Sequence, residues 1–151
     1  KRSNHNQLRL VGQPKNAFPD EDMSKSMLVF IKERLKNNPN IKIIENPTGL
    51  AYAQLGIHNI IGGHFETKDL GKELMEYSKT YNVPLDYIVS GHWHCSFSGE
   101  IGINSEYLSV RSIIGVNPYS MKINKTANAG ASMFVFDQND GLVDEHKYKL
   151  H

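Results

Sequence analysis

The chain has 151 residues, which is enough for one domain of ordinary size with a buried core. Its formal net charge at pH 7 is only +1, so the composition gives no sign of a generally basic surface for nucleic acid. A single cysteine excludes an intrachain disulfide framework and is typical of a reducing cytoplasm, where we expect the protein to reside. No apolar run reaches membrane-spanning length and no signal-peptide pattern opens the sequence, so we expect no membrane partner.

The first third of the sequence predicts a loop, a helix and a short strand. Glycine and prolines interrupt residues 1–20, which should form a loop. Apolar residues four apart predict an amphipathic helix over residues 21–36, with Asp20 as its cap. An apolar run at residues 41–44 predicts a strand. The basic side chains near the end of the helix should be solvated, with phosphate binding as the alternative: Lys32, Arg34 and Lys36.

Two strands, a helix and a third strand should follow. Residues 50–55 and 57–63 predict a pair of strands joined near Gly56. A helix is expected from about Asp69, its cap, to Tyr81, and residues 86–89 form a short apolar strand. This helix has the length of a crossover between parallel strands. The strands before and after it should therefore end at the same edge of one sheet.

The last third of the sequence predicts mainly strands. Residues 116–130 should form a polar, mobile loop. We expect mixed α/β architecture, with a second sheet built mainly from residues 96–150 and the two helices outside. The strands are expected at residues 96–103, 106–112, 131–137 and 142–150.

Histidines follow both of the predicted parallel strands. His64 ends the first, and His92 and His94 follow the second. Residues two apart in an extended chain point the same way, and neutral imidazole is a common metal ligand. Because open α/β sheets place their sites at the carboxyl ends of strands, the three rings should share a metal site. The alternative is that these histidines are partly exposed loop residues without a ligand role. Cys95 should be a small buried residue rather than a thiolate ligand. His58 should be a structural or exposed residue.

Three motifs resemble those of the calcineurin-like metallophosphoesterases. The segment Gly91-His92-Trp93-His94 is similar to the family's Gly-His-x-His signature, and Ser3-Asn4-His5-Asn6 to its Gly-Asn-His-Asp/Glu motif. Residues 60–64 resemble the strand that carries the family's single metal-binding histidine. The resemblance covers essentially the whole chain but only the second half of such a domain. The family's Asp-x-His and Gly-Asp-x-x-Asp motifs are expected before residue 1.

The resemblance implies that residues 1–151 are a single partial domain. It would be half of a four-layer α/β/β/α sandwich, with mixed sheets and flanking helices. The N-terminal half would be missing here or supplied separately. A naturally short, degenerate homologue is the alternative.

The resemblance also implies a site with two divalent ions, manganese first, with iron or zinc as alternatives. Asn4, His64 and His92 would bind one ion, and His94 the other. His5 would be the catalytic residue that contacts the phosphate or protonates the leaving group. The bridging carboxylate of such a site belongs to the absent motifs, so the isolated chain should supply only part of it.

The sequence departs from the family pattern near two of these residues. Ser3 replaces a glycine, and Asn6 replaces the acid that would support His5, whose charge an amide cannot supply. After His64, Phe65 and Glu66 stand where the family has glycine and then histidine or aspartate. In an alternative register, Gly62 would occupy the ligand position and one ligand would be lost.

The resemblance implies metal-dependent hydrolysis of a phosphomonoester or phosphodiester by the intact protein. A phosphate ester would then be its substrate. One alternative is a non-catalytic binding module that keeps the fold. Another is a DNA-processing nuclease subunit, against which the balanced charge argues, since a DNA track usually shows clustered lysine and arginine.

Overall fold

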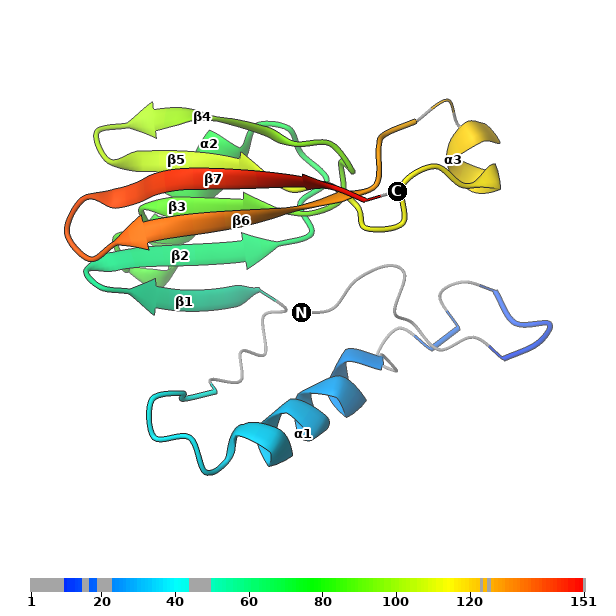
Figure 1. Ribbon diagram of the computed structural model, residues 1–151, viewed down its shortest axis with the longest axis horizontal. Coiled ribbons are helices and arrows are strands. Elements are labelled where there is room, and N and C mark those ends of the chain that lie inside the picture. Colours follow the sequence, from blue (N-terminus) through cyan, green and yellow to red (C-terminus); the bar gives the residue numbers. More distant parts are fainter. Residues whose placement is uncertain are drawn as a thin grey trace. The chain divides into compact units, whose positions relative to one another are not determined.

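The computed structural model describes residues 10–14, 17–18, 23–43, 50–122, 124 and 126–150. The chain divides into two compact units, Lys1–Leu50 and Ala51–His151, and each is described by itself. Figure 1 shows the course of the helices and strands. Within the described ranges, no helix has both the length and the hydrophobicity that crossing a bilayer requires.

The first unit contains helix α1, Met23–Leu35 (Figure 1). This confirms the helix expected from the apolar spacing. None of its residues is buried. The strand expected at residues 41–44 is wrong for residues 41–43, which form no strand. The described part of this unit holds no strand to pair with them, and an unpaired strand is not stable. Asp20, the expected cap, lies outside the described residues.

The second unit is built on a mixed five-stranded sheet with the order β1-β2-β3-β5-β4. The three inner strands run parallel to one another, and the edge strands β1 and β4 are antiparallel to their neighbours. The pair of strands expected around Gly56, β1–β2, is confirmed, and β4 and β5 form a second hairpin. The strands are β1 Ala51–Leu55, β2 His58–Gly63, β3 Tyr87–Ser90, β4 Phe97–Gly102 and β5 Ser105–Ser109.

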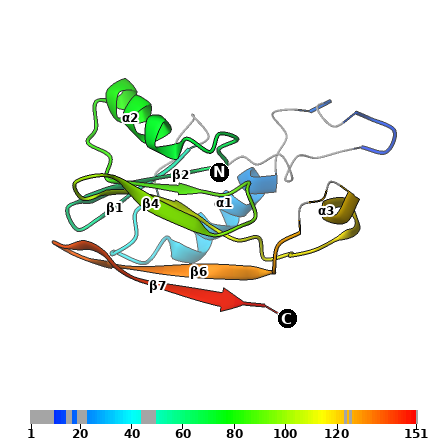
Figure 2. The ribbon, with the colours of Figure 1, turned by 90° about the horizontal axis from the view of Figure 1, so that it is seen from above.

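Helix α2, Leu70–Tyr81, connects β2 to β3 and covers one face of the sheet (Figure 2). Asp69 caps it, since its side-chain oxygen accepts a hydrogen bond from the amide of Lys72 at 3.1 Å. Asn82 ends it in the left-handed conformation, with φ of 52°. The predicted crossover between parallel strands is therefore confirmed, including both of its ends.

The hairpin of β6, Gly130–Asp137, and β7, Gly141–Lys149, lies on the opposite face of the sheet (Figure 2). The predicted α/β class is confirmed. The expectation that β4 and β5 belong to the second sheet is wrong. β5 pairs with β3 and β4 pairs with β5, so both strands belong to the first sheet. Leu108 of β5 thereby joins the same core as its neighbours on β2 and β3. The core consists of Ile60, Tyr87 and Leu108, packed with Val89, Phe134, Phe136 and Leu142.

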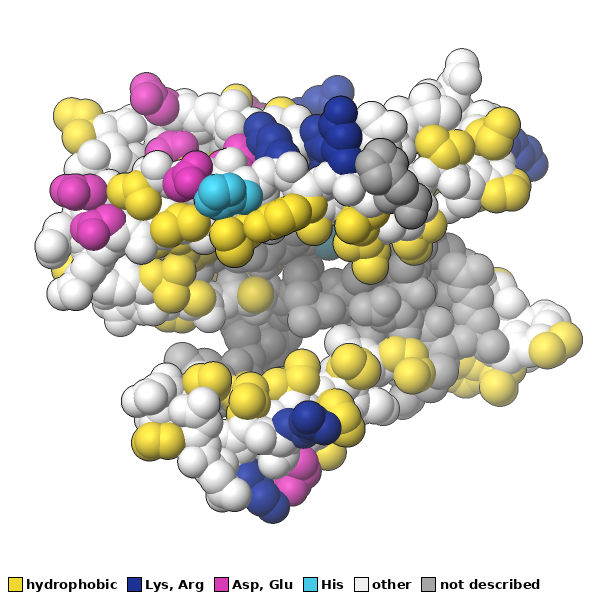
Figure 3. Space-filling view, viewed as in Figure 1, with side chains coloured by type: hydrophobic (Ala, Val, Ile, Leu, Met, Phe, Trp, Pro, Cys, Tyr) yellow, Lys and Arg dark blue, Asp and Glu magenta, His cyan; other side chains and the backbone are white. Residues whose placement is uncertain are grey.

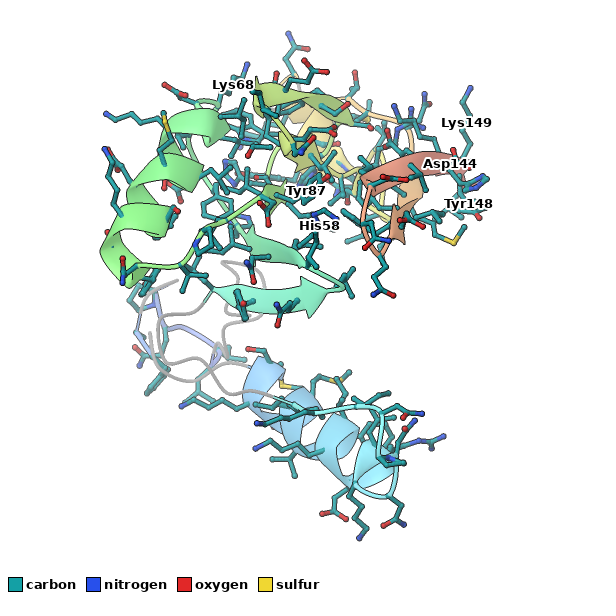
Figure 4. The ribbon with its side chains drawn as sticks, turned by 90° about the vertical axis from the view of Figure 1, so that its left-hand side faces the viewer. His58, Lys68, Tyr87, Asp144, Tyr148 and Lys149 are labelled. Carbon is teal, nitrogen blue, oxygen red and sulfur yellow. The ribbon has the colours of Figure 1, made fainter. Side chains whose placement is uncertain are left out.

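Tyr87 fastens the hairpin to the sheet from the middle of this core. Its ring is 2% exposed, and its hydroxyl oxygen accepts a hydrogen bond from the amide of Leu142 at 3.0 Å. Figure 4 shows Tyr87 and His58 together between the sheet and the hairpin. The buried His58 ring is nearly perpendicular to that of Tyr87, at 77°, with 5.9 Å between ring centroids. His58 is therefore a structural residue, which is one of the two alternatives expected from the sequence.

Residues 116–130 differ from the polar loop that the sequence predicts. Helix α3, Pro118–Lys122, occupies part of this range. The side-chain oxygen of Asn117 accepts a hydrogen bond from the amide of Ser120 at 2.8 Å, which caps this turn. The exposed side chains here include the apolar Val116, Tyr119 and Met121. Apolar side chains are also exposed on the β6–β7 hairpin: Met133, Val135, Val143 and Tyr148. Figure 3 shows hydrophobic side chains on the face of this hairpin that is turned to the viewer.

Candidate functional site

His64 and His92 meet at the carboxyl edge of the sheet. Gly63 on β2 and Ser90 on β3 are partners in the parallel ladder, and the amide of Gly91 donates to the carbonyl of Gly63 at 2.9 Å. Nδ1 of His92 lies 3.2 Å from Nε2 of His64. The two rings are nearly perpendicular, at 81°, with 4.5 Å between their centroids. The shared edge predicted from the crossover thus brings these two side chains together.

The spacing of the two ring nitrogens suits a shared metal ion. Two nitrogens bound to one zinc at about 2.0–2.1 Å in tetrahedral geometry lie about 3.3–3.4 Å apart. The 3.2 Å separation in this protein is close to that value. Both side chains are half-buried, so solvent and ions can reach this edge. The same separation is that of a hydrogen bond in which one ring donates and the other accepts, according to the tautomers, so the distance alone assigns no ion.

The expectation of an extended backbone at His92 and His94 is wrong. His92 has φ of 83° and His94 has φ of 59°, both in the left-handed region. Such values are uncommon for residues other than glycine. Consequently the spacing of two residues does not by itself place the His94 ring beside that of His92.

No complete ligand set is present in the part of the chain that the structure describes. Within those residues, no three or more His, Cys, Asp or Glu side chains are grouped so as to hold an ion. Asn4 and His5 lie outside the described residues. The roles of His64, His92 and His94 as metal ligands, and of His5 as the catalytic residue, stay predictions.

Trp93 ties the histidine segment to the segment that follows β2. Its indole N–H donates to the carbonyl of Thr67 at 3.2 Å. Its ring lies edge-on to His92, with 5.1 Å between centroids, and the ammonium of Lys68 lies 5.0 Å from the Trp93 ring centroid. Sequence reasoning missed Thr67 and Lys68, because both contacts join residues about 25 positions apart. These contacts hold one wall of the site in place.

Phe65, which departs from the family pattern, is a core residue. It is 6% exposed and its ring lies 6.0 Å from that of Tyr77 on α2. A Cβ on Gly63 would overlap the Phe65 ring, so any larger residue at this position requires that ring to shift. Among the carboxylates near the site, Glu66 is exposed and Asp69 is engaged as the cap of α2.

Cys95 is exposed, which corrects the expectation of a small buried residue. Its carbonyl oxygen accepts a hydrogen bond from the hydroxyl of Ser109 at 3.0 Å. Ser109 is 1% exposed and lies on β5, the strand next to β3. Nothing in the sequence pointed to Ser109, since a serine within a strand carries no signal of a tertiary contact.

Comparison with known proteins gives remote relatives. No family model matches the chain. It is 23% identical over 154 residues to the SPbeta prophage-derived uncharacterized protein YonJ of Bacillus subtilis (strain 168), an alignment that covers 99% of this chain and 38% of that protein. The chain thus spans about two fifths of the length of that relative.

Similar solved structures include two of Vps29 from Entamoeba histolytica. One, of the wild type complexed with Zn²⁺, has a TM-score of 0.46 and 18% identity, covering 66% of this chain and 59% of that one. The other, of a single mutant, has a TM-score of 0.47 and 13% identity, covering 74% of this chain and 66% of that one. Identities and scores at this level do not define a family.

Proposed function

We propose that the intact protein hydrolyses a phosphomonoester or phosphodiester with divalent metal ions, and that this chain supplies part of the site. The contact between His64 and His92 supports this proposal most directly. Two parallel strands deliver these imidazoles to one solvent-accessible edge, with 3.2 Å between ring nitrogens. This is where the resemblance to calcineurin-like metallophosphoesterases requires two ligands of one ion.

The proposed roles divide the site between holding ions and handling the substrate. His64 and His92 hold one ion together with Asn4, and His94 contributes to the second. His5 contacts the phosphate or donates a proton to the leaving group. Bound ions, with manganese as the first candidate and iron or zinc next, would polarise the phosphoryl oxygen and lower the pKa of water. The missing carboxylate ligand would be supplied by the domain's other half. A cytoplasmic location is part of the proposal.

Alanine variants of the histidines test the proposal. His64→Ala and His92→Ala each remove one nitrogen donor, so each should weaken Mn²⁺ binding and lower the hydrolysis of a chromogenic phosphodiester by orders of magnitude in the intact protein. The matched control is His146→Ala on β7, a half-exposed histidine that is not among the proposed ligands and whose ring pairs with Asp144 at 2.8 Å. Unchanged Mn²⁺ affinity in both site variants would refute the metal roles.

The isolated 151-residue chain is the second test. It should bind Mn²⁺ weakly and show almost no hydrolysis, because the bridging carboxylate is absent. Full activity in this chain would mean that other acidic residues, such as Glu66, supply the carboxylates. Replacing His5 in the intact protein should slow turnover with little loss of metal.

A non-catalytic binding module is the second candidate. It is favoured by the departures of Ser3, Asn6 and Phe65 from the family's motifs. An intact protein that carries both upstream motifs, binds Mn²⁺ and still hydrolyses no phosphate ester would support this alternative. Cleavage of DNA but not of small esters would instead support the nuclease alternative.

A further inference from the structure

The segment that carries His92 and His94 crosses over the end of β5. It leaves β3 at Ser90 and enters β4 at Phe97, and both of these residues are ladder partners of Ser109 on β5. The amide of Val110 donates to the carbonyl of Ser90 at 3.0 Å and closes the end of the ladder. Ser109 therefore lies beneath the middle of this crossing, which we term the histidine loop, residues 91–96.

The histidine loop has a backbone that needs support. Both of its histidines have positive φ, at 83° and 59°, which L-residues with a Cβ adopt only at a cost in free energy. Such conformations persist where surrounding contacts determine them. From the sheet beneath, the Ser109 hydroxyl reaches the loop at the carbonyl of Cys95, one residue beyond His94, at 3.0 Å.

We propose that Ser109 is a positioning residue for the proposed metal site. Its buried hydroxyl holds the Cys95 carbonyl, fixes the loop in its left-handed turns and so sets the His92 ring against that of His64. This inference rests on the proposed function only in assigning metal binding to the paired histidine rings. The arrangement itself follows from the register of three strands and one hydrogen bond donated by a buried serine.

The experiment compares Ser109→Ala with Ser78→Ala in the full 151-residue chain. Both changes remove a serine hydroxyl that donates to a backbone carbonyl; for Ser78 the acceptor is Val83, at 2.7 Å, beyond the end of α2. One readout is the nuclear Overhauser effect between the His64 and His92 rings, without metal. The other is affinity for Mn²⁺ alone. If Ser109→Ala does not fold, Ser109→Cys keeps the side-chain shape and replaces the hydroxyl with a weak donor.

Ser109→Ala should lose the ring-to-ring signal and weaken Mn²⁺ binding about tenfold or more, as changes to groups that orient metal ligands do. Ser78→Ala should retain both. A retained signal and affinity in the Ser109 variant, or an equal loss in the Ser78 variant, would overturn the inference. If the wild-type chain binds no Mn²⁺ while its ring-to-ring signal depends on Ser109, the positioning role stands and the prediction that this chain binds Mn²⁺ by itself fails. The proposed function fails if the intact protein also binds no Mn²⁺.

Discussion

Replacing Tyr87 with phenylalanine should loosen the β6–β7 hairpin from the sheet. The change removes one oxygen atom and keeps the ring, which packs edge-on against Phe136 with 4.9 Å between centroids. The Leu142 amide then loses the hydroxyl oxygen that accepts its hydrogen bond at 3.0 Å. Leaving such a donor unpaired costs about 1–3 kcal/mol in free energy of unfolding. For a unit of this size, each kcal/mol lowers the melting temperature by about 4–8 °C.

The assay is thermal unfolding followed by circular dichroism, with Tyr52→Phe as the matched control. The Tyr52 hydroxyl donates to the side-chain oxygen of Asn59 at 2.6 Å, but this tyrosine is 39% exposed on the edge strand β1. Water can replace that bond, so the control should lose no more than about 1 kcal/mol. Equal losses in the two variants would refute the reasoning, because they would show that burial of the Tyr87 contact adds nothing.

Three further predictions concern pH and packing. Burial raises the pKa of Glu106, so the folded state binds the carboxyl proton more tightly than the unfolded state does. The stability of the protein therefore falls as pH rises through the glutamate range. Glu106→Gln should melt at a higher temperature than the wild type at neutral pH and at the same temperature at about pH 3. Backbone amides, first that of Asn139, lower the pKa of Asp137, so this group stabilises the fold above the aspartate range. Asp137→Asn should melt at a lower temperature than the wild type at neutral pH, and the two melting temperatures should converge as pH falls below that range. A difference that persists at low pH would contradict this cause. Gly63→Ala should displace the Phe65 ring, cost about 1–3 kcal/mol of stability and weaken the ring-to-ring signal of the histidines; a variant with wild-type melting temperature and signal would show that the ring moves freely.

The sequence by itself determined the local elements and the meeting of two histidines. The i, i+4 spacing of apolar residues defined α1 and α2, and Asp69 and Asn82 fixed the ends of α2. A helix of this length between two apolar strands is typical of a crossover between parallel strands, and parallel strands end at one edge. That topology predicts that His64 and His92 lie at the same edge of the sheet, where the structure has their ring nitrogens 3.2 Å apart.

Only the tertiary structure decided how the later strands associate and how the histidine loop is held. Each strand of residues 96–150 has an apolar side whichever sheet it joins, so periodicity could not show that β5 pairs with β3. The left-handed conformations at His92 and His94 are adopted by residues other than glycine, so the sequence does not predict them. They depend on hydrogen bonds from Ser109 and Trp93 to partners 14 and 26 residues away, and such pairings form only when the chain has folded.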